Sequence, residues 1–204
     1  MLKQLSVIAI ALLATQANAA VNQPFVTLGF GQSSYSEVSD FCANELLVSV
    51  NCDDKDTAFR IGAGVAISPM YAVELTYMNH GEVGGAYAEP GFDAKIDLEA
   101  ETFALQASVQ TSIAPQINVY GKAGLALTKA SVSYQENDVF FGSFSETDDN
   151  DTTGLILSIG AQYEVMPNLM ADIQFDFLPD AIEYKDANFE SDITTISAGL
   201  KYQF

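Results

Sequence analysis

The only histidine in the chain is the first residue to consider for catalysis. His80 precedes Gly81 and Glu82, and no serine lies beside it in the sequence. A histidine that acts as a general base needs a nucleophile, such as a serine hydroxyl, within hydrogen-bond reach. A serine from elsewhere in the fold would meet that need, but the local sequence supplies none. We therefore predict no enzymatic activity, no catalytic residues and no cofactor.

A run of acidic residues raises the question of metal binding. Asp148, Asp149, Asn150 and Asp151 are consecutive, and oxygen-rich loops of this kind hold divalent cations well. The run lacks the layout of an EF-hand loop, which requires an acid at its twelfth position. We therefore favour a solvated acidic loop and predict no metal site.

Seven other charged residues share one property: each lies where apolar and polar residues alternate, on the polar side of the alternation. They are Arg60, Glu74, Lys122, Glu164, Asp172, Asp176 and Lys201. A period of two is typical of a strand with two unlike faces. Buried charges are tolerated only when they are paired, so three bases and four acids predict a structural network of ion pairs. A gated ion path is the alternative.

The N-terminal residues predict secretion. Lys3 is followed by an apolar run from Val7 to Ala14 and by Ala17-Asn18-Ala19, a pattern that signal peptidase cleaves. The run is shorter than the roughly 20 apolar residues of a transmembrane helix. We predict a cleaved signal peptide at residues 1–19 and one domain at residues 20–204.

The two cysteines fit that route. Cys42 and Cys52 lie close together in a polar stretch, and secretion takes them through an oxidising compartment, so we predict a disulfide between them. It would enclose Leu46-Leu47-Val48. Metal binding by two cysteines without histidine partners is disfavoured.

Composition excludes one class of partner. Without Lys3 the chain has 27 acidic and 7 basic residues, a formal charge of −20. Nucleic acid is excluded, because phosphate binding requires a basic surface. The chain is nevertheless 49% hydrophobic, so apolar and charged residues must be separated in space.

Alternating stretches predict eight strands, three short turns and four long loops. The turns are centred at Pro69, Pro115 and Pro167, and we expect the loops at residues 35–56, 81–101, 135–152 and 179–192. We expect the strands near residues 24–34, 57–68, 71–80, 102–112, 117–130, 153–165, 169–178 and 193–204. Each strand has roughly the 9–11 residues of a tilted membrane strand. Counting residues from the short turns places Glu164 level with Lys201, and Arg60 level with Asp176.

The distribution of charge favours a membrane barrel over a soluble one. The four predicted loops hold 23 of the 27 acids, and the apolar face of the strands carries no charge apart from Lys129 near a loop end. A charge at the bilayer midplane costs a barrel about 2–4 kcal/mol, so a charge-free face suits lipid contact. We therefore predict an all-β protein, an eight-stranded antiparallel up-and-down transmembrane β-barrel in a bacterial outer membrane. Its eight strands leave room only for side chains in the interior.

The chain resembles the small outer-membrane barrels of the OmpA transmembrane-domain and OmpX class. The resemblance covers residues 20–204 and rests on three motifs: the ending Ala198-Gly199-Leu200-Lys201-Tyr202-Gln203-Phe204, the strand Tyr120-Gly121-Lys122-Ala123-Gly124-Leu125-Ala126 and the turn Met166-Pro167-Asn168-Leu169. The ending resembles the signal read by the barrel-assembly machinery, carried by Leu200, Tyr202 and Phe204. Nothing follows Phe204, so we expect no peptidoglycan-binding domain.

The resemblance implies a structural or surface-interaction role, in adhesion or membrane integrity. The implied partners are outer-membrane lipid, lipopolysaccharide and an extracellular ligand or host surface, with the loops facing outward. A narrow ion pore is one alternative. A lipid A-modifying enzyme is another, although such barrels use a histidine working with a serine.

Overall fold

The computed structural model describes residues 22–36, 38, 50–89, 91–138, 142–184 and 189–204. Nearly all of them lie in antiparallel strands, and none of these ranges contains a helix long and apolar enough to span a bilayer. The strands are β1 (Gln23–Tyr35), β2 (Val50–Asp53), β3 (Lys55–Ala66), β4 (Tyr71–Glu89), β5 (Phe92–Ala114), β6 (Ile117–Asp138), β7 (Gly142–Met166), β8 (Leu169–Tyr184) and β9 (Phe189–Gln203).

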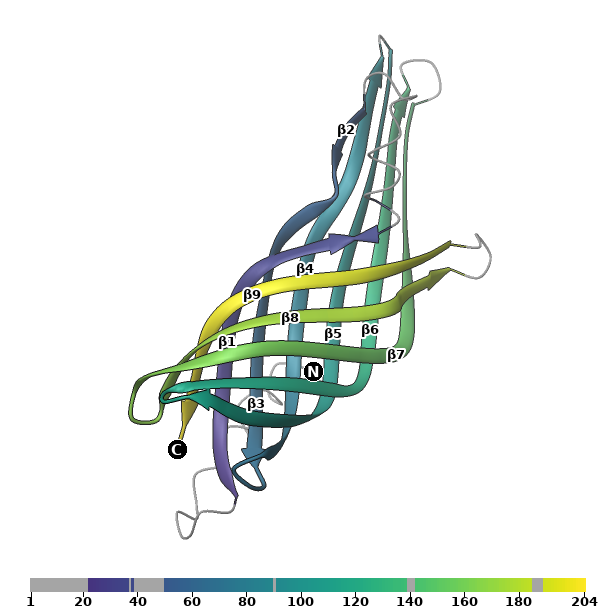
Figure 1. The fold of residues 1–204 in the computed structure, drawn as a ribbon. Coiled ribbons are helices and arrows are strands. Elements are labelled where there is room, and N and C mark those ends of the chain that lie inside the picture. The colour runs from purple at the N-terminus through teal and green to yellow at the C-terminus, as the bar shows by residue number, and fades with distance from the viewer. Residues whose placement is uncertain (1–21, 37, 39–49, 90, 139–141, 185–188) are drawn as a thin grey trace.

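Eight of these strands close into a barrel (Figure 1). Each pairs with its neighbours in the chain, and the ring closes where β1 pairs with β9. The ninth segment, β2, pairs with β4 beyond the end of the β3 pairing. The predicted eight-stranded up-and-down barrel is confirmed.

Tight turns join the strands at one end of the barrel. Gln116 and Asn168 each have φ of 70°, in the left-handed region that the second central residue of a type II turn requires. Each follows a proline that lacks the N–H needed for a strand ladder. The turns predicted at Pro115 and Pro167 are thus present.

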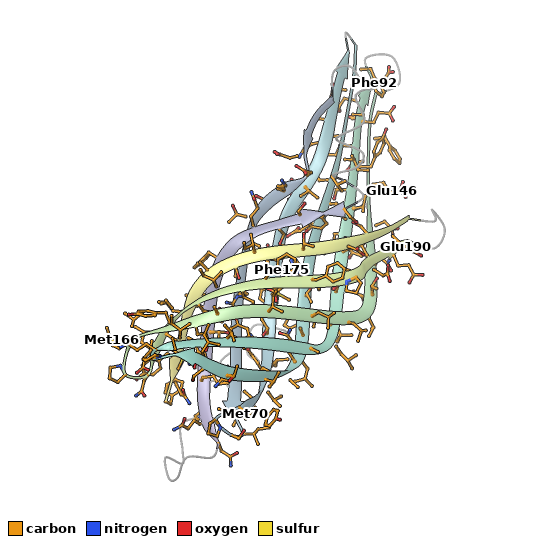
Figure 2. The ribbon with its side chains drawn as sticks, viewed as in Figure 1. Met70, Phe92, Glu146, Met166, Phe175 and Glu190 are labelled. Atoms are coloured by element: carbon orange, nitrogen blue, oxygen red, sulfur yellow. The ribbon has the colours of Figure 1, made fainter. Side chains whose placement is uncertain are left out.

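The two faces of the barrel wall are the reverse of those in a soluble protein. Outward side chains such as Leu105, Leu125 and Ile159 are more than half exposed, at 56%, 61% and 65%. Inward side chains such as Arg60, Gln106 and Asp176 are at most 2% exposed. Figure 2 shows the outward side chains covering the wall. This distribution suits a lipid solvent outside and a sealed polar interior.

Two of the predicted loops are in fact strands. The predicted loop at 81–101 is replaced by residues 82–89 and 92–101, which continue the β4–β5 hairpin past an irregularity between Asn79 and Glu82. The predicted loop at 135–152 is replaced by residues 135–138 and 142–152, which continue the β6–β7 pairing in register. Alternation continues through them with polar residues on both faces, so they do not have the appearance of membrane strands. The other two loops are shorter than predicted. β2 and the start of β3 lie within the predicted loop 35–56, and β8 and β9 extend into the predicted loop 179–192.

These extensions form a sheet that rises beyond the barrel. It consists of β2, residues 82–89 of β4, 92–101 of β5, 129–138 of β6 and 142–152 of β7, and we call it the protruding sheet. It reaches roughly 30 Å at about 3.3 Å per residue. In Figure 1, β4 to β7 continue upward past the ends of β8 and β9.

A separation between β7 and β8 frees one side of this sheet. Their pairing ends at Leu157 and Phe177, while β8 follows β9 through an irregularity between Leu178 and Ile182. Among the described residues, β7 therefore has β6 as its only strand partner from residue 142 to residue 156.

Candidate functional site

Two buried ion pairs occupy the barrel interior. The Arg60 guanidinium pairs with the Asp172 carboxylate, and Lys122 Nζ lies 2.6 Å from Glu74 Oε2. All four side chains are at most 6% exposed. We call these residues and the polar groups bonded to them the lumen network. Pairing of this kind is what allows charges to stay away from water.

Neutral polar groups join the two pairs. The Tyr120 hydroxyl donates to Asp172 and to Gln174, both at 2.8 Å. Lys122 also donates to Gln174 Oε1 at 2.9 Å, while Thr27 donates to Glu74 at 2.6 Å. The network therefore links strands on opposite sides of the ring, and its side chains are buried in the interior.

Backbone register explains why Arg60 pairs with Asp172. Arg60, Gly29, Gly199 and Asp172 lie in one row across β3, β1, β9 and β8. A Cβ atom at Gly29 would lie 2.8 Å from Arg60 Nε, so the glycine leaves room for the guanidinium to cross. Counting levels from the short turns had placed Arg60 beside Asp176, because that count ignores the stagger of strands around a closed barrel.

Three of the seven charged residues lie outside these two ion pairs. Asp176 accepts hydrogen bonds from Ser158 at 2.5 Å and Gln174 at 2.6 Å. The Lys201 ammonium lies 4.2 Å from the centre of the Phe25 ring, a cation–π contact. The prediction that Glu164 belongs to the buried network was wrong, since its side chain is exposed at the short-turn end. There the strand has already left the enclosed interior.

A layer of hydroxyl groups surrounds the single histidine. His80 Nδ1 lies 3.1 Å from Ser33 Oγ and 3.2 Å from Thr195 Oγ1, and its Nε2 lies 3.0 Å from Thr102 Oγ1. The fold thus supplies the serine that the local sequence lacks. The His80 side chain is fully buried, and no carboxylate hydrogen-bonds to it within the described ranges. The arrangement is that of a satisfied buried imidazole without access for a substrate.

An apolar cluster closes the interior beneath the protruding sheet. Its largest members, Tyr35, Met78, Ile156, Ile182 and Ile193, are at most 2% exposed. The remaining members are Val83, Leu98, Ala100, Ala104, Ala126, Ala130, Leu178 and Ala181. This cluster was not expected from the sequence, because its residues lie at the strand ends and in segments assigned to loops.

The protruding sheet is acidic on its outward face. Lys95 Nζ lies 2.7 Å from Asp97 Oδ2, and Lys129 Nζ lies 3.1 Å from Asp149 Oδ2. A hydrogen bond from the Ser131 hydroxyl, together with Lys129, holds the pKa of Asp149 below its usual value. Two lysines cannot offset the acids of this sheet, so its charge stays strongly negative. Among the described residues, no group of three or more acidic, histidine or cysteine side chains is arranged to hold a metal ion.

The last strand carries the predicted assembly signal at its end. Leu200, Tyr202 and Phe204 point outward and are 49%, 43% and 62% exposed, and their role as an assembly signal stays a prediction. Cys42 lies outside the described residues, so the disulfide with Cys52 also stays a prediction. Counting free thiols by mass spectrometry would test it.

Comparisons with known proteins agree with the barrel. A family model described as outer membrane protein beta-barrel domain matches residues 5–204. Outer membrane protein P5 of Haemophilus influenzae is 29% identical over 143 residues, which are 65% of this chain and 39% of P5. The chain thus spans about two fifths of the length of that relative.

Solved structures of small barrels share the fold. Neisserial surface protein A superposes with a TM-score of 0.56 at 19% identity, over 89% of this chain and 97% of that one. Ail, the attachment invasion locus protein of Yersinia pestis, superposes with a TM-score of 0.51 at 14% identity, over 90% of this chain and 99% of that one.

Proposed function

The chain belongs to the family of outer membrane protein beta-barrel domains, and from that premise we propose that it is a surface-interaction protein that binds its partners through the protruding sheet. It is an integral barrel of the outer membrane. The observation that carries the proposal is the contrast between an interior occupied by buried side chains and a long sheet held clear of the barrel.

The interior argues against the pore alternative. The lumen network occupies the barrel with buried side chains, and the apolar cluster extends from the outer ends of the barrel strands into the base of the protruding sheet. Hydrophobic constrictions block ions because water does not wet them. A conducting path would have to break buried ion pairs and also hydrate the apolar cluster.

The free edge of β7 supplies a binding mode. Residues 142–147 pair with β6 on one side only and their side chains are exposed. An extended peptide adds to such an edge through main-chain hydrogen bonds, while neighbouring side chains provide specificity. Edge strands are usually protected against this by charge, and here the protecting charge is uniformly acidic.

Charge selects the class of partner. Ail, the attachment invasion locus protein, has been solved in complex with the heparin analogue sucrose octasulfate, a polyanion. The protruding sheet of this chain is acidic and would repel such a ligand. We therefore expect a cationic protein segment in extended conformation, steered by long-range attraction.

The enzyme alternative has a specific obstacle. A lipid-modifying reaction would need His80 and Ser33 to meet a lipid, but both side chains are fully buried in the interior. We infer that the pair is structural.

The binding test compares the full-length barrel with a variant whose β6–β7 hairpin is shortened. Residues 134–146 are replaced by Asn-Gly, which favours a tight hairpin turn and keeps the Ser133 and Thr147 pair. We expect the wild type to bind an extended lysine-rich peptide in a salt-dependent manner, and the shortened variant to bind it more weakly. The matched control peptide has the same charge with proline at every third position, so it cannot add as a strand.

Three outcomes would overturn the proposal: equal binding by both barrels, equal binding of both peptides, or preferential binding of sucrose octasulfate. Planar-bilayer recording tests the pore alternative separately. We expect no steady conductance from the wild type.

A further inference from the structure

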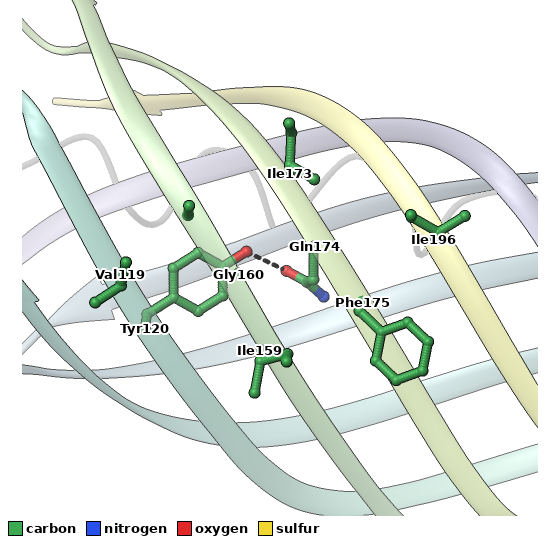
Figure 3. A pocket seen from close by; sticks show the side chains of 9 residues that line it. Val119, Tyr120, Ile159, Gly160, Ile173, Gln174, Phe175 and Ile196 are labelled. Atoms are coloured by element: carbon green, nitrogen blue, oxygen red, sulfur yellow. Dashed lines mark hydrogen bonds between the residues drawn. The ribbon is translucent and has the colours of Figure 1, made fainter.

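A groove runs over the outward face of the barrel wall where β6, β7, β8 and β9 lie side by side (Figure 3). Its volume is about 450 Å³. The outward side chains that line it are entirely apolar: Val119, Ile159, Ala161, Ile173, Phe175 and Ile196.

The strand register creates the groove by placing a small residue among large ones. Ala161 lies between Val119 on β6 and Ile173 on β8 in one row. The next row toward the protruding sheet holds Ile159 and Phe175. The methyl group of Ala161 is much shorter than the side chains around it, so the wall is hollowed at that point.

The floor of the groove is closed. Gly160 lies between Tyr120 and Gln174 in the register, and the Tyr120 hydroxyl donates to Gln174 on the inner side, as the dashed line in Figure 3 shows. The β7–β8 pairing is continuous from Leu157 to Glu164. The groove is therefore a depression in the wall and not an opening into the interior.

The depth and lining of the groove decide what can fill it. Ile159, Ile173 and Ile196 are 65%, 61% and 59% exposed, so this wall faces the hydrocarbon of the membrane. Ala161 lies five residues before Met166, at the short-turn end of β7. Short turns of such barrels face the periplasm, so the hollow at Ala161 lies in the periplasmic half of the wall, within reach of acyl chains from the periplasmic leaflet, where the lipids are phospholipids.

We propose that this groove binds one acyl chain of a phospholipid from the periplasmic leaflet. If the hollow stayed empty, both the groove wall and the surrounding lipid would lose dispersion contacts. Lipid hydrocarbon is the material that can fill it at this depth in the bilayer. In membranes, where apolar burial alone does not drive association, small residues bring surfaces into close contact and packing supplies the affinity. A chain seated over Ala161 would contact the larger side chains on either side of it.

The test uses native mass spectrometry of the full-length barrel exchanged from palmitoyl-oleoyl phosphatidylethanolamine vesicles into detergent. Ala161→Leu fills the hollow. The matched control is Ala123→Leu, which makes the same change at an exposed alanine on the outward face of β6, outside the groove. Gel mobility of unboiled samples verifies that both variants fold.

We expect the wild type and Ala123→Leu to retain one phospholipid, and Ala161→Leu to retain it at least about fivefold less, as loss of buried methylene contacts implies. Phospholipid with a nitroxide on its acyl chain should broaden the amide resonances of Val119 and Ala161 more than that of Ala107. Equal retention by the two variants would overturn the proposal. In a second sample whose vesicles also contain lipid A, retention of lipid A in preference to phospholipid would overturn it too. The proposal would also fail if the wild type carried a second barrel in place of a lipid and Ala161→Leu lost that barrel.

Discussion

At the scale of single residues, the interior depends on pairs that are chosen by register. Gly62 shows the same principle as Gly29, since a Cβ atom there would lie 2.5 Å from both Glu74 Oε1 and Thr27 Oγ1. The missing side chain leaves space for the bond between Thr27 and Glu74. Charged residues and inward glycines therefore act together, and replacing either should disturb the network.

Removing one member of a buried pair tests the network directly. Lys122→Ala would leave Glu74 without its cation, and a buried unpaired charge typically costs about 3–5 kcal/mol. Lys129→Ala is the matched control, because its pair with Asp149 is exposed and such pairs contribute little. Urea unfolding in lipid vesicles, followed by the mobility of unboiled samples, measures both. Similar unfolding curves for the two variants would contradict the structural role of the Lys122 pair.

A double-mutant cycle tests the space at Gly29. Gly29→Ala should destabilise the wild type, because the three atoms nearest to the added methyl all belong to the Arg60 side chain. In an Arg60→Ala background the same change should cost much less. The expected coupling free energy is on the order of 1 kcal/mol or more, from the same unfolding measurement. A coupling free energy near zero would mean that the Arg60 side chain moves aside without lowering the free energy of unfolding.

The sequence allowed the inward charges to be predicted, but not their partners. Alternation identifies the face of a strand, so six of the seven charged residues lie inside as expected. Partner choice depends on the stagger between strands, which no local pattern contains. The neutral members Thr27, Tyr120 and Gln174 were missed because polar residues on an inward face look alike. Gly29 and Gly62, at inward positions, were the available signal.

At the scale of elements, the hairpins are longer than their hydrophobicity suggested. Membrane strands are recognised by an apolar face, and that face ends near Phe103 and Leu127, the last large apolar residues before Glu101 and Lys129. Beyond this point the strands continue in water, where polar alternation gives no contrast. Acidic composition was therefore wrongly taken as the end of the strands.

Hydrogen exchange distinguishes a protruding sheet from loops. Residues 93–101 of β5 have strand partners on both sides, except Ala100, which lacks one on β4, so the amides of this segment should exchange slowly. Residues 142–147 of β7 have a partner on one side, so about every second amide should exchange quickly, as antiparallel pairing requires. NMR of the barrel in lipid nanodiscs would measure this. Uniformly fast exchange over 93–101 would favour the loop interpretation.

At the scale of the whole molecule, the two ends of the barrel differ. The short-turn end has tight turns at Pro69, Pro115 and Pro167, whereas the other end carries the protruding sheet and its acids. The asymmetry matches the short periplasmic turns and longer outer segments of outer-membrane barrels. In this orientation the apolar cluster lies near the extracellular side of the membrane, and the groove at Ala161 lies nearer the periplasmic side. Orientation in the membrane is therefore the prediction on which the binding and lipid proposals both depend.

Protease treatment of intact cells tests that orientation. A protease of broad specificity should cut the connections between β4 and β5, between β6 and β7, or between β8 and β9, because they lie at the outer end. It should leave the three short turns intact, since the membrane keeps the enzyme from the periplasm. In cells with a permeabilised outer membrane the short turns become reachable, and this arm controls for their intrinsic resistance to cleavage. Cuts at Pro69, Pro115 or Pro167 in intact cells would show the reverse orientation. The protruding sheet would then face the periplasm, and the groove at Ala161 would face the outer leaflet.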